Sequence, residues 1–567
     1  MTSNSALLAE LAERYWRFEC HEMPLTAALA GQSLPDAVLF RESQLDHQRR
    51  DRVAGELLEA LQAVTVAGLS AQERATLRLL QRELEGIRSQ YQVLAHLRPS
   101  LLPLGPDFMA VYWANATNIV DAAAAELYVA RLAGIPHYLR DVQANIEVAQ
   151  AMGISNPRAV LDGAMSNSRN ILSLPIETSP WLGPFRRSPA AAQPPVQAQA
   201  AAALALVQGS LQPALLAWSS FLAELATGDT LSCVQGPQGD AFYRVLVRNF
   251  SNGEMEPAQI HALGLQEVQR LLGEMQDVAV QAGFEGDLSG YRAFLASDPQ
   301  FVARDGSALL SAMESLCKRI DKRIPAFFGR IPRITYGVDS IPVAMSAQLP
   351  PAYAQPSPAD GSGPGIFWVS SLPEKCPSYL HPAMALHEAW PGHLMHMALM
   401  NEQSELPSFR RYGAVKYTAC VEGWALYCET LGVEMGMYAT PHEHYGRLEM
   451  EMWRAVRLVV DTGIHLHHWS RDRAIDYMVA NLTLSRATIE AEVDRYASLP
   501  AQALGYQIGN LKLRELRQRA ERKLGARFSH RGFHEAVMTA GAVTLPVLED
   551  LVVNWLDATN AASRTGT

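Results

Sequence analysis

Most of this chain carries apolar residues spaced three and four positions apart, and this spacing is what most limits the folds it can adopt. The pattern runs through residues 70–97, 122–153 and 257–283, and it resumes at 382 and continues nearly to the C-terminus. In an α-helix such positions share one face, which can pack against a core. The sequence therefore predicts a mostly α fold, built from many helices.

One region, between about residues 329 and 373, breaks the helical pattern. It alternates β-branched or aromatic residues with Pro and Gly, which is typical of short strands and turns. We expect two or three strands here, the last at 365–371. They would form a small sheet that precedes the next helix.

This change of pattern suggests a division of the chain. Residues 1–328 would form a helical N-terminal region, in which the Pro- and Ala-rich stretch near 174–199 connects helices across the surface. Residues 329–567 would hold the small sheet and the later helices. We expect the two regions to form one compact unit.

Composition argues against some classes of function. The net charge is −10 over 567 residues, and a nucleic-acid partner would need an excess of Lys and Arg. The six cysteines are scattered with no CxxC pair, which indicates free thiols in a reducing compartment. The N-terminus lacks a signal-peptide core, and we see no apolar run near the ~20 residues of a membrane span. These features predict a cytoplasmic protein that binds neither nucleic acid nor membranes.

The stretch HPAMALHEAWPGHLMH, residues 381–396, places a His-Glu pair at His387 and Glu388 inside a predicted helix. The next histidine, His393, lies six positions after His387. In an unbroken helix these side chains would point about 120° apart and lie ~9 Å apart along the axis. Pro391 and Gly392 stand between them and could bend the chain so that both histidines reach one metal ion. The alternative is a helix that ends at Trp390, with His393 capping the next one.

A second motif, VEGWALYCE, supplies two carboxylates, Glu422 and Glu429. Seven positions are two helical turns, so both side chains lie on one face. The residues between them are almost all apolar, and a buried carboxylate needs a cation or a metal. A zinc hydrolase needs a third protein ligand and an open position for water. The alternative is that both glutamates pair with arginines.

The two motifs together resemble the bacterial domain-of-unknown-function 885 family, whose members carry His-Glu-x-x-Pro-Gly-His and Glu-Gly-Trp-Ala. Further similar segments are 351–369, 454–478, 503–517 and 533–552, so the resemblance covers essentially the whole chain. The family is regarded as zinc metallopeptidases with a mostly helical fold. The spacing of Glu422 and Glu429 is also similar to that in thimet-type oligopeptidases and helical metallocarboxypeptidases.

This resemblance implies one Zn²⁺ ion held by His387, His393 and Glu422, with Glu388 as the general base. It also implies that Glu429 supports the ligands without binding the metal. Many members have two consecutive histidines after Pro-Gly, whereas here Leu394 follows His393. The next histidine, His396, is therefore a minor alternative ligand.

The oxyanion formed during amide hydrolysis needs a further hydrogen-bond donor. Tyr506, flanked by glycines, is one candidate, and the alternative is a tyrosine packed in the core. His465 is the other. It lies four residues after Asp461, which could orient its ring, and the alternative is a structural role holding Glu422 or Glu429.

Two features suggest how substrate could bind. The strand at 365–371 could offer its backbone edge to an extended peptide, or simply bury Phe367 and Trp368. Arg457 or Arg517 could grip a substrate carboxylate with paired hydrogen bonds. The alternative for these arginines is a solvated helical face.

The function predicted from these residues is zinc-dependent hydrolysis of amide bonds in short peptides or peptide-like substrates, which is the activity of a metallopeptidase. Two alternatives stay open. One is a scaffold without catalysis that binds a metal or a ligand, and the other is a zinc amidase acting on a specialised metabolite. The sequence indicates no oligomeric state.

Overall fold

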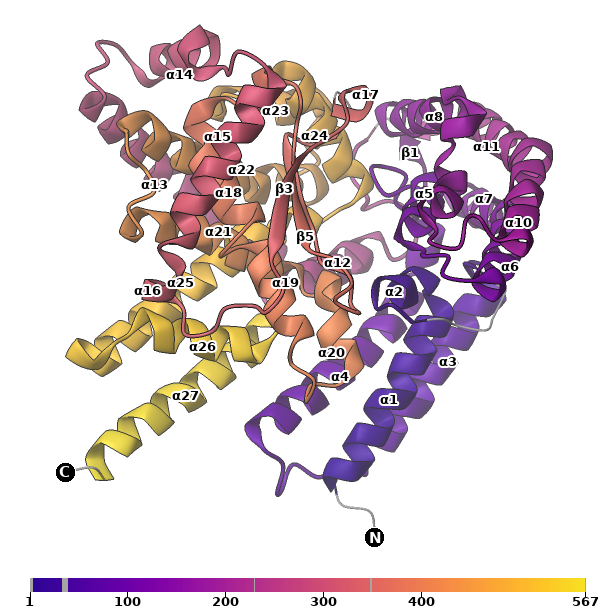
Figure 1. Ribbon diagram of the computed structural model, residues 1–567, viewed down its shortest axis with the longest axis horizontal. Helices are drawn as coiled ribbons and strands as arrows, with labels where there is room; N and C mark the ends of the chain where they lie inside the picture. The colour runs from indigo at the N-terminus through magenta and orange to yellow at the C-terminus, as the bar shows by residue number, and fades with distance from the viewer. Residues whose placement is uncertain (1–3, 33–38, 229, 347–348, 566–567) are drawn as a thin grey trace.

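The computed structural model describes residues 4–32, 39–228, 230–346 and 349–565, and its architecture is mostly helical, as predicted (Figure 1). The first four helices lie together, and Figure 1 shows α1, α3 and α4 side by side in the lower part of the molecule. Their bounds are α1 Asn4–Glu22, α2 Pro24–Leu29, α3 Gln44–Leu61 and α4 Ala71–Gln92. Ser70 and Glu73 form a reciprocal capping box that begins α4.

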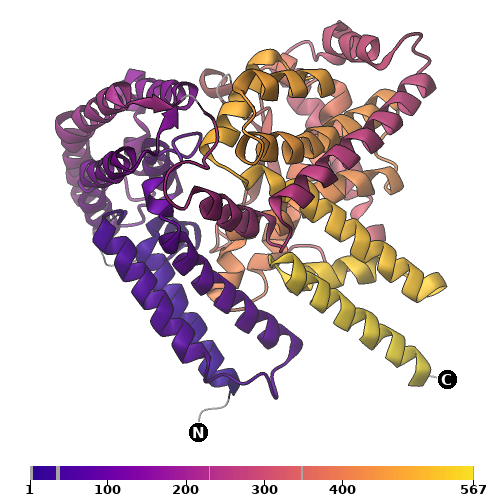
Figure 2. The same ribbon diagram turned by 180° about the vertical axis from the view of Figure 1, so that it is seen from behind.

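The next group of helices gathers on one side of the molecule, at the right in Figure 1 and at the left in Figure 2. These helices are α5 Pro106–Ala116, α6 Ala122–Leu132, α7 Ile135–Ala151, α8 Arg158–Ser173, α9 Gly183–Arg187, α10 Pro194–Leu206 and α11 Gln212–Glu224. The single helix predicted over 122–153 is in fact two, because Pro136 stands at the start of α7, where it cannot continue α6. The predicted connection at 174–199 holds α9 and buries Trp181 and Phe185, so it does more than cross the surface.

The expectation that no apolar run approaches the length of a membrane span is wrong. Within the described residues, α10 and α11 join through the π-helical turn η4 (Val207–Leu211) into one helix over Pro194–Glu224. This helix has 31 residues, and its most apolar window has a mean hydropathy of 1.4 and is 22% buried. Alanines and a lack of charge raise its hydropathy without long apolar stretches of Leu or Ile. One such helix is weak evidence for a membrane span.

The middle of the chain leads to the small sheet. Its helices are α12 Gly239–Ser251, α13 Pro257–Gln281, α14 Leu288–Ser297, α15 Gly306–Asp321 and α16 Ile324–Phe327. Strands β3 Tyr336–Ser340, β4 Ala352–Gln355 and β5 Gly365–Val369 then form a sheet in the order β3-β5-β4, with the four-residue helix α17 Val343–Ser346 between β3 and β4. Two short strands elsewhere, β1 Asn156–Pro157 and β2 Thr227–Gly228, pair in parallel.

The sheet confirms three predicted strands but corrects the role given to the last one. Strand β5 is central, because it pairs in parallel with β3 and antiparallel with β4. Its backbone hydrogen-bonding groups are used on both sides, so it has no free edge for a peptide. The alternative of burial in the core is confirmed for Phe367, which is fully buried, but not for Trp368, which is only partly buried.

The C-terminal half supplies the helices that surround the candidate site. Their bounds are α18 His381–Glu388, α19 His393–Asn401, α20 Ser408–Tyr412, α21 Thr418–Glu434, α22 Pro441–His465, α23 Arg471–Asn481, α24 Arg486–Ser498, α25 Gly505–Leu524, α26 His530–Ala540 and α27 Leu545–Thr565. Thr440 and Glu443 form a capping box that begins α22.

The hydrophobic core consists of two large clusters. One joins the N-terminal helices to the sheet, α18, α21 and the last helices. The other joins α5–α11 to α13, α22, α23 and α24. Both clusters therefore contain residues from before and after position 328, the predicted boundary between the two regions.

Candidate metal centre

The chain breaks between the two motif histidines. Helix α18 ends at Glu388 and α19 begins at His393. A Cβ atom on Gly392 would lie 1.9 Å from the His387 carbonyl oxygen and 2.5 Å from that of Leu386. Only glycine fits so close to another backbone segment. The return of the chain at this glycine brings the His387 and His393 rings to a centroid distance of 4.8 Å.

The side chains of His387, His393 and Glu422 converge. One ligand atom from each lies within 4.8 Å of the others. The Glu422 Oε2 atom is 3.2 Å from His393 Nε2 and 3.5 Å from His387 Nε2. Two imidazole nitrogens and a carboxylate are a donor set that suits zinc. The Glu422 side chain is 21% exposed, so one side of the group is open to solvent.

Glu429 lies behind this group and orients one ligand. Its Oε1 atom accepts a hydrogen bond from His387 Nδ1 at 2.7 Å. This bond holds a proton on Nδ1 and orients the ring so that Nε2 faces Glu422, where Nε2 could bind a metal once its own proton is lost. The alternative that both glutamates pair with arginines holds for Glu429 alone, whose Oε1 atom is 4.0 Å from Arg454 Nη2, the limit of an ion pair. Glu422 instead faces the two histidines.

The pKa values of His387 and Glu422 are shifted because the histidines and the carboxylates are hydrogen-bonded to each other. Burial acts to lower the pKa of His387, but hydrogen bonds to Glu422 and Glu429 raise this pKa to about 9. Burial acts to raise the pKa of Glu422, but His393 and His387 hold this pKa well below its usual range. A cation in place of these protons would satisfy the same carboxylate.

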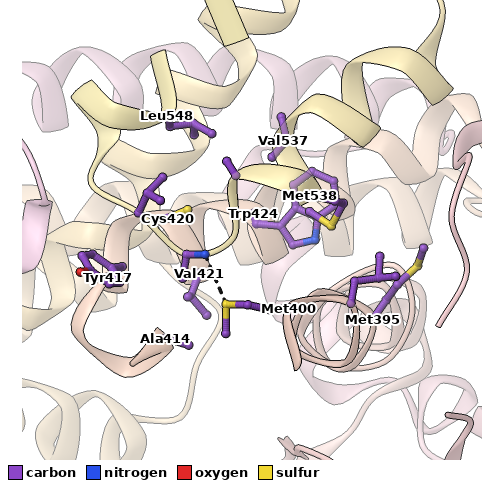
Figure 3. Close-up of a cluster of buried hydrophobic side chains, with 14 of the residues drawn as sticks. Met395, Met400, Ala414, Tyr417, Cys420, Val421, Trp424, Val537, Met538 and Leu548 are labelled. Carbon is purple, nitrogen blue, oxygen red and sulfur yellow. Dashed lines mark hydrogen bonds between the residues drawn. The ribbon is translucent and has the colours of Figure 1, made fainter. Parts of the chain in front are cut away.

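Trp424 joins the two motifs, and sequence reasoning did not single it out. Its Nε1 atom donates a hydrogen bond to the Pro391 carbonyl oxygen at 2.9 Å, so the EGWA helix holds the Pro-Gly turn in place. Figure 3 shows its ring beside Val537 and Met538, from α26. The apolar residues around Trp424 in the sequence indicated that it is buried, but they did not indicate that its indole N–H bonds to Pro391.

Tyr506 stands beside the site because α21 and α25 cross closely. A Cβ atom on Gly509 would lie 1.7 Å from the Ala419 carbonyl oxygen, and one on Gly423 would lie 2.4 Å from Gly509. These glycines allow the two backbones to touch. Burial and the charge of Glu422 raise the pKa of Tyr506. The tyrosine is partly exposed.

Glu388, the predicted base, is the last residue of α18 and is partly exposed. Its charge contributes to the raised pKa of the neighbouring candidate ligand His387. The carboxylate is thus near the candidate ligands.

The predicted pairing of Asp461 with His465 is wrong. His465 accepts a hydrogen bond at Nδ1 from the Cys233 N–H, at 3.1 Å, and its Nε2 atom lies 3.0 Å from the Tyr496 carbonyl oxygen. Asp461 instead accepts hydrogen bonds from the Tyr243 hydroxyl and the Ala501 N–H. Both ring nitrogens of His465 are used by the backbone, so it has a structural role, although it does not hold Glu422 or Glu429.

The two arginines named from the sequence have different surroundings. Arg517 is ion-paired with Glu434 and Glu521, which leaves little capacity for a substrate. Arg457 is buried, and its guanidinium carbon lies 4.6 Å from the centre of the Tyr506 ring. The structure therefore places Arg457, but not Arg517, beside the candidate centre.

His396, the minor alternative ligand, is not part of the converging group. It is buried beside the Trp424 ring. Neither of its ring nitrogens has a hydrogen-bond partner among the described residues. Burial lowers the pKa of His396 to about 3, so this histidine is neutral.

Comparisons with solved structures identify the fold. A structure described as a "putative lipoprotein" from Colwellia psychrerythraea is 27% identical, with a TM-score of 0.89, and the match covers 98% of this chain and 100% of that one. A second "putative lipoprotein", from Shewanella oneidensis, is 16% identical with a TM-score of 0.74 and coverage of 98% and 100%. An M32 carboxypeptidase from Deinococcus radiodurans R1 is 11% identical, with coverage of 92% and 98%, and its TM-score of 0.33 is too low to support an argument.

No curated protein matches this chain. A family model described as "Bacterial protein of unknown function (DUF885)" matches residues 24–552, which confirms the resemblance seen in the two motifs. The chain belongs to this DUF885 family of bacterial proteins.

Proposed function

We propose that this protein is a zinc-dependent hydrolase that cleaves amide bonds of short peptides or peptide-like substrates. The observation that carries the proposal is the convergence of His387, His393 and Glu422 with Glu388 directly after one of them in the chain. Three protein donors with an open side are the arrangement of a catalytic zinc site.

A zinc ion held by these residues would polarise the amide carbonyl and make a water molecule more acidic. Glu388 takes a proton from that water and passes it to the leaving amine. Tyr506 donates a hydrogen bond to the oxygen that gains negative charge. Because burial and Glu422 raise the pKa of Tyr506, its phenol keeps the proton that this donation needs. Glu429 holds the His387 ring in its orientation.

Metal analysis combined with an activity screen tests the proposal. Purified protein should contain about one zinc ion per chain, and it should hydrolyse members of a broad library of short peptides. A chelator should abolish the hydrolysis, and added zinc should restore it. Bound zinc without hydrolysis of any peptide or small-molecule amide would contradict the proposal and favour a non-catalytic scaffold. Hydrolysis of small amides alone would favour a metabolite amidase.

The compartment is a separate question. The cytoplasmic location expected from the sequence stays a prediction, whereas the description of two structural relatives as lipoproteins favours the cell envelope for those proteins. Fractionation of the native host, with detection of the full-length protein, distinguishes the two locations.

A further inference from the structure

Two buried arginines on α22 have unused hydrogen-bond donors. Arg454 and Arg457 are each 5% exposed. The Nε atom of Arg454 and the Nη1 atom of Arg457 are buried and have no hydrogen-bond partner among the described residues. Buried donors are nearly always paired in folded proteins, so an unpaired guanidinium N–H points to a ligand or an ordered water molecule.

Both arginines lie against the candidate metal centre. Their guanidinium carbons are 5.9 Å (Arg454) and 4.6 Å (Arg457) from the centre of the Tyr506 ring. The charge of Glu422 acts on the same tyrosine. The Arg454 Nη2 atom is also 4.0 Å from Glu429, which is hydrogen-bonded to His387. Tyr506 thus neighbours both arginines and feels the charge of the candidate ligand Glu422.

The positive charge of this pair is only partly compensated. Arg457 donates to the Tyr496 hydroxyl at 3.2 Å and to Glu492 at 3.1 Å. Glu492 also receives two hydrogen bonds from Arg495, each 2.9 Å long, so two arginines share one carboxylate. Arg454 donates to the neutral Met450 carbonyl oxygen and has no carboxylate within hydrogen-bond distance among the described residues.

Neighbouring rings hold the guanidinium of Arg457. Its carbon lies 4.5 Å from the centre of the Trp453 ring as well as against Tyr506. Stacking of this kind fixes the plane of a guanidinium, which then presents its N–H groups in a constant direction. Such a planar donor suits a carboxylate better than a single point charge does.

We propose that Arg457, assisted by Arg454, binds the C-terminal carboxylate of a peptide whose last amide bond lies at the metal centre. The enzyme would then remove residues from the C-terminus of short peptides. This inference rests on the proposed function and adds the substrate class: peptides with a free C-terminal carboxylate. Tyr506, which lies near both arginines, would then be beside the bond to be cleaved.

Paired substrates test the proposal. The zinc-loaded protein is given N-acetylated dipeptides and tripeptides with a free C-terminus, and the same peptides as C-terminal amides. We expect kcat/KM to be at least about tenfold higher for the free acids, with most of the difference in KM. Equal kcat/KM for acids and amides would overturn the proposal while leaving the hydrolase function intact.

Variants assign the preference to the arginine. Arg457→Gln should remove the preference for the free acids, so that the ratio of kcat/KM between each acid and its amide falls from at least about tenfold to about one. Arg457→Lys, which keeps the charge but loses the planar donor, should retain part of it. The control is Arg519→Gln. Arg519 is 42% exposed and pairs with Glu549, so it is not one of the buried arginines with unpaired donors. An undiminished preference in folded Arg457→Gln or Arg457→Lys protein, judged by circular dichroism, would contradict the assignment.

Binding without turnover separates this inference from the proposed function. Calorimetric titration of the zinc-loaded Glu388→Gln variant with the same acids and amides measures affinity alone. Tighter binding of the acids, lost when Arg457→Gln is added, would support the carboxylate site even if the protein hydrolyses nothing. Equal affinities for acids and amides would reject the site, and the buried donors would then be assigned to ordered water.

Discussion

Glu422 is the residue on which the proposed metal site most depends, because its carboxylate faces the Nε2 atoms of both His387 and His393. Glu422→Ala removes the charged ligand, and we expect zinc content to fall from about one ion per chain to well under half. Metal analysis of purified protein measures this. The control Glu434→Ala changes a glutamate of the same helix that pairs with Arg517 and His530, and it should retain zinc. Full occupancy in Glu422→Ala would refute the ligand assignment.

Substitution of Glu388 tests catalysis separately from metal binding. Glu388→Gln keeps the size of the side chain but cannot accept the proton from water. We expect kcat to fall by roughly 10²–10⁴-fold, the usual contribution of general base catalysis, while zinc content is unchanged. Steady-state kinetics on the best peptide of the library, with metal analysis of the same sample, measures both. Activity close to that of the natural protein would show that another group takes the proton.

At the scale of elements, the turn between α18 and α19 determines whether the two histidines meet. Gly392→Ala would place a Cβ atom 1.9 Å from the His387 carbonyl oxygen, so the turn must open. We expect the free energy of unfolding to fall by at least about 2 kcal/mol and zinc affinity to fall with it. Urea denaturation and metal titration measure the two effects.

Gly273→Ala is the matched control for this substitution. Gly273 lies within α13, and a Cβ atom there meets nothing within 4 Å. Alanine is favoured over glycine inside a helix, so this variant should gain about 0.5–1 kcal/mol of stability. Unchanged stability and zinc affinity in Gly392→Ala would mean that the turn is not the element that brings the histidines together.

At the scale of the whole molecule, a buried ion network joins helices that are distant in the sequence. Glu451 of α22 accepts hydrogen bonds from Arg270 of α13 at 2.6 Å, from Arg447 at 2.8 Å and from Arg514 of α25 at 2.9 Å. Glu451→Gln leaves these cations without their central anion, and we expect a loss of about 3–5 kcal/mol of stability. Glu490→Gln, which alters an exposed pair within α24, should change stability by under about 1 kcal/mol.

The same network predicts a response to acid. Burial acts to raise the pKa of Glu451, but the three arginines lower this pKa to about 2, from 4.5 in the unfolded chain. The unfolded state therefore binds more protons between these values, and stability falls as the pH drops from about 4.5 towards 2. Denaturation curves measured at several pH values in this range give the free energy of unfolding at each pH. This free energy should depend less steeply on pH in Glu451→Gln than in the natural protein. An identical dependence of the free energy of unfolding on pH in both proteins would show that other carboxylates cause the acid response.

The sequence by itself determined the helical class and the composition of the candidate site. Period-3.6 patterns indicate helices because burial of one face is a local property of the chain. The change of pattern before 382 likewise indicated the small sheet, and the motif spacing singled out His387, His393 and Glu422. The sequence did not indicate that the helix over 122–153 is interrupted just before Pro136, or that residues 194–224 form one long helix with Glu224 as its one charged residue. The local signals for both features were weak.

Only the tertiary structure decided which of the singled-out residues meet. His465 and Asp461 lie four apart on one helix, yet each bonds to a different distant segment. Arg457 and Arg517 were equal candidates until packing placed one beside Tyr506 and the other against Glu434. The physical reason is that hydrogen bonds and ion pairs between remote segments depend on how the helices cross. Here the close approach of α21 to α25 at Gly423 and Gly509 sets that crossing.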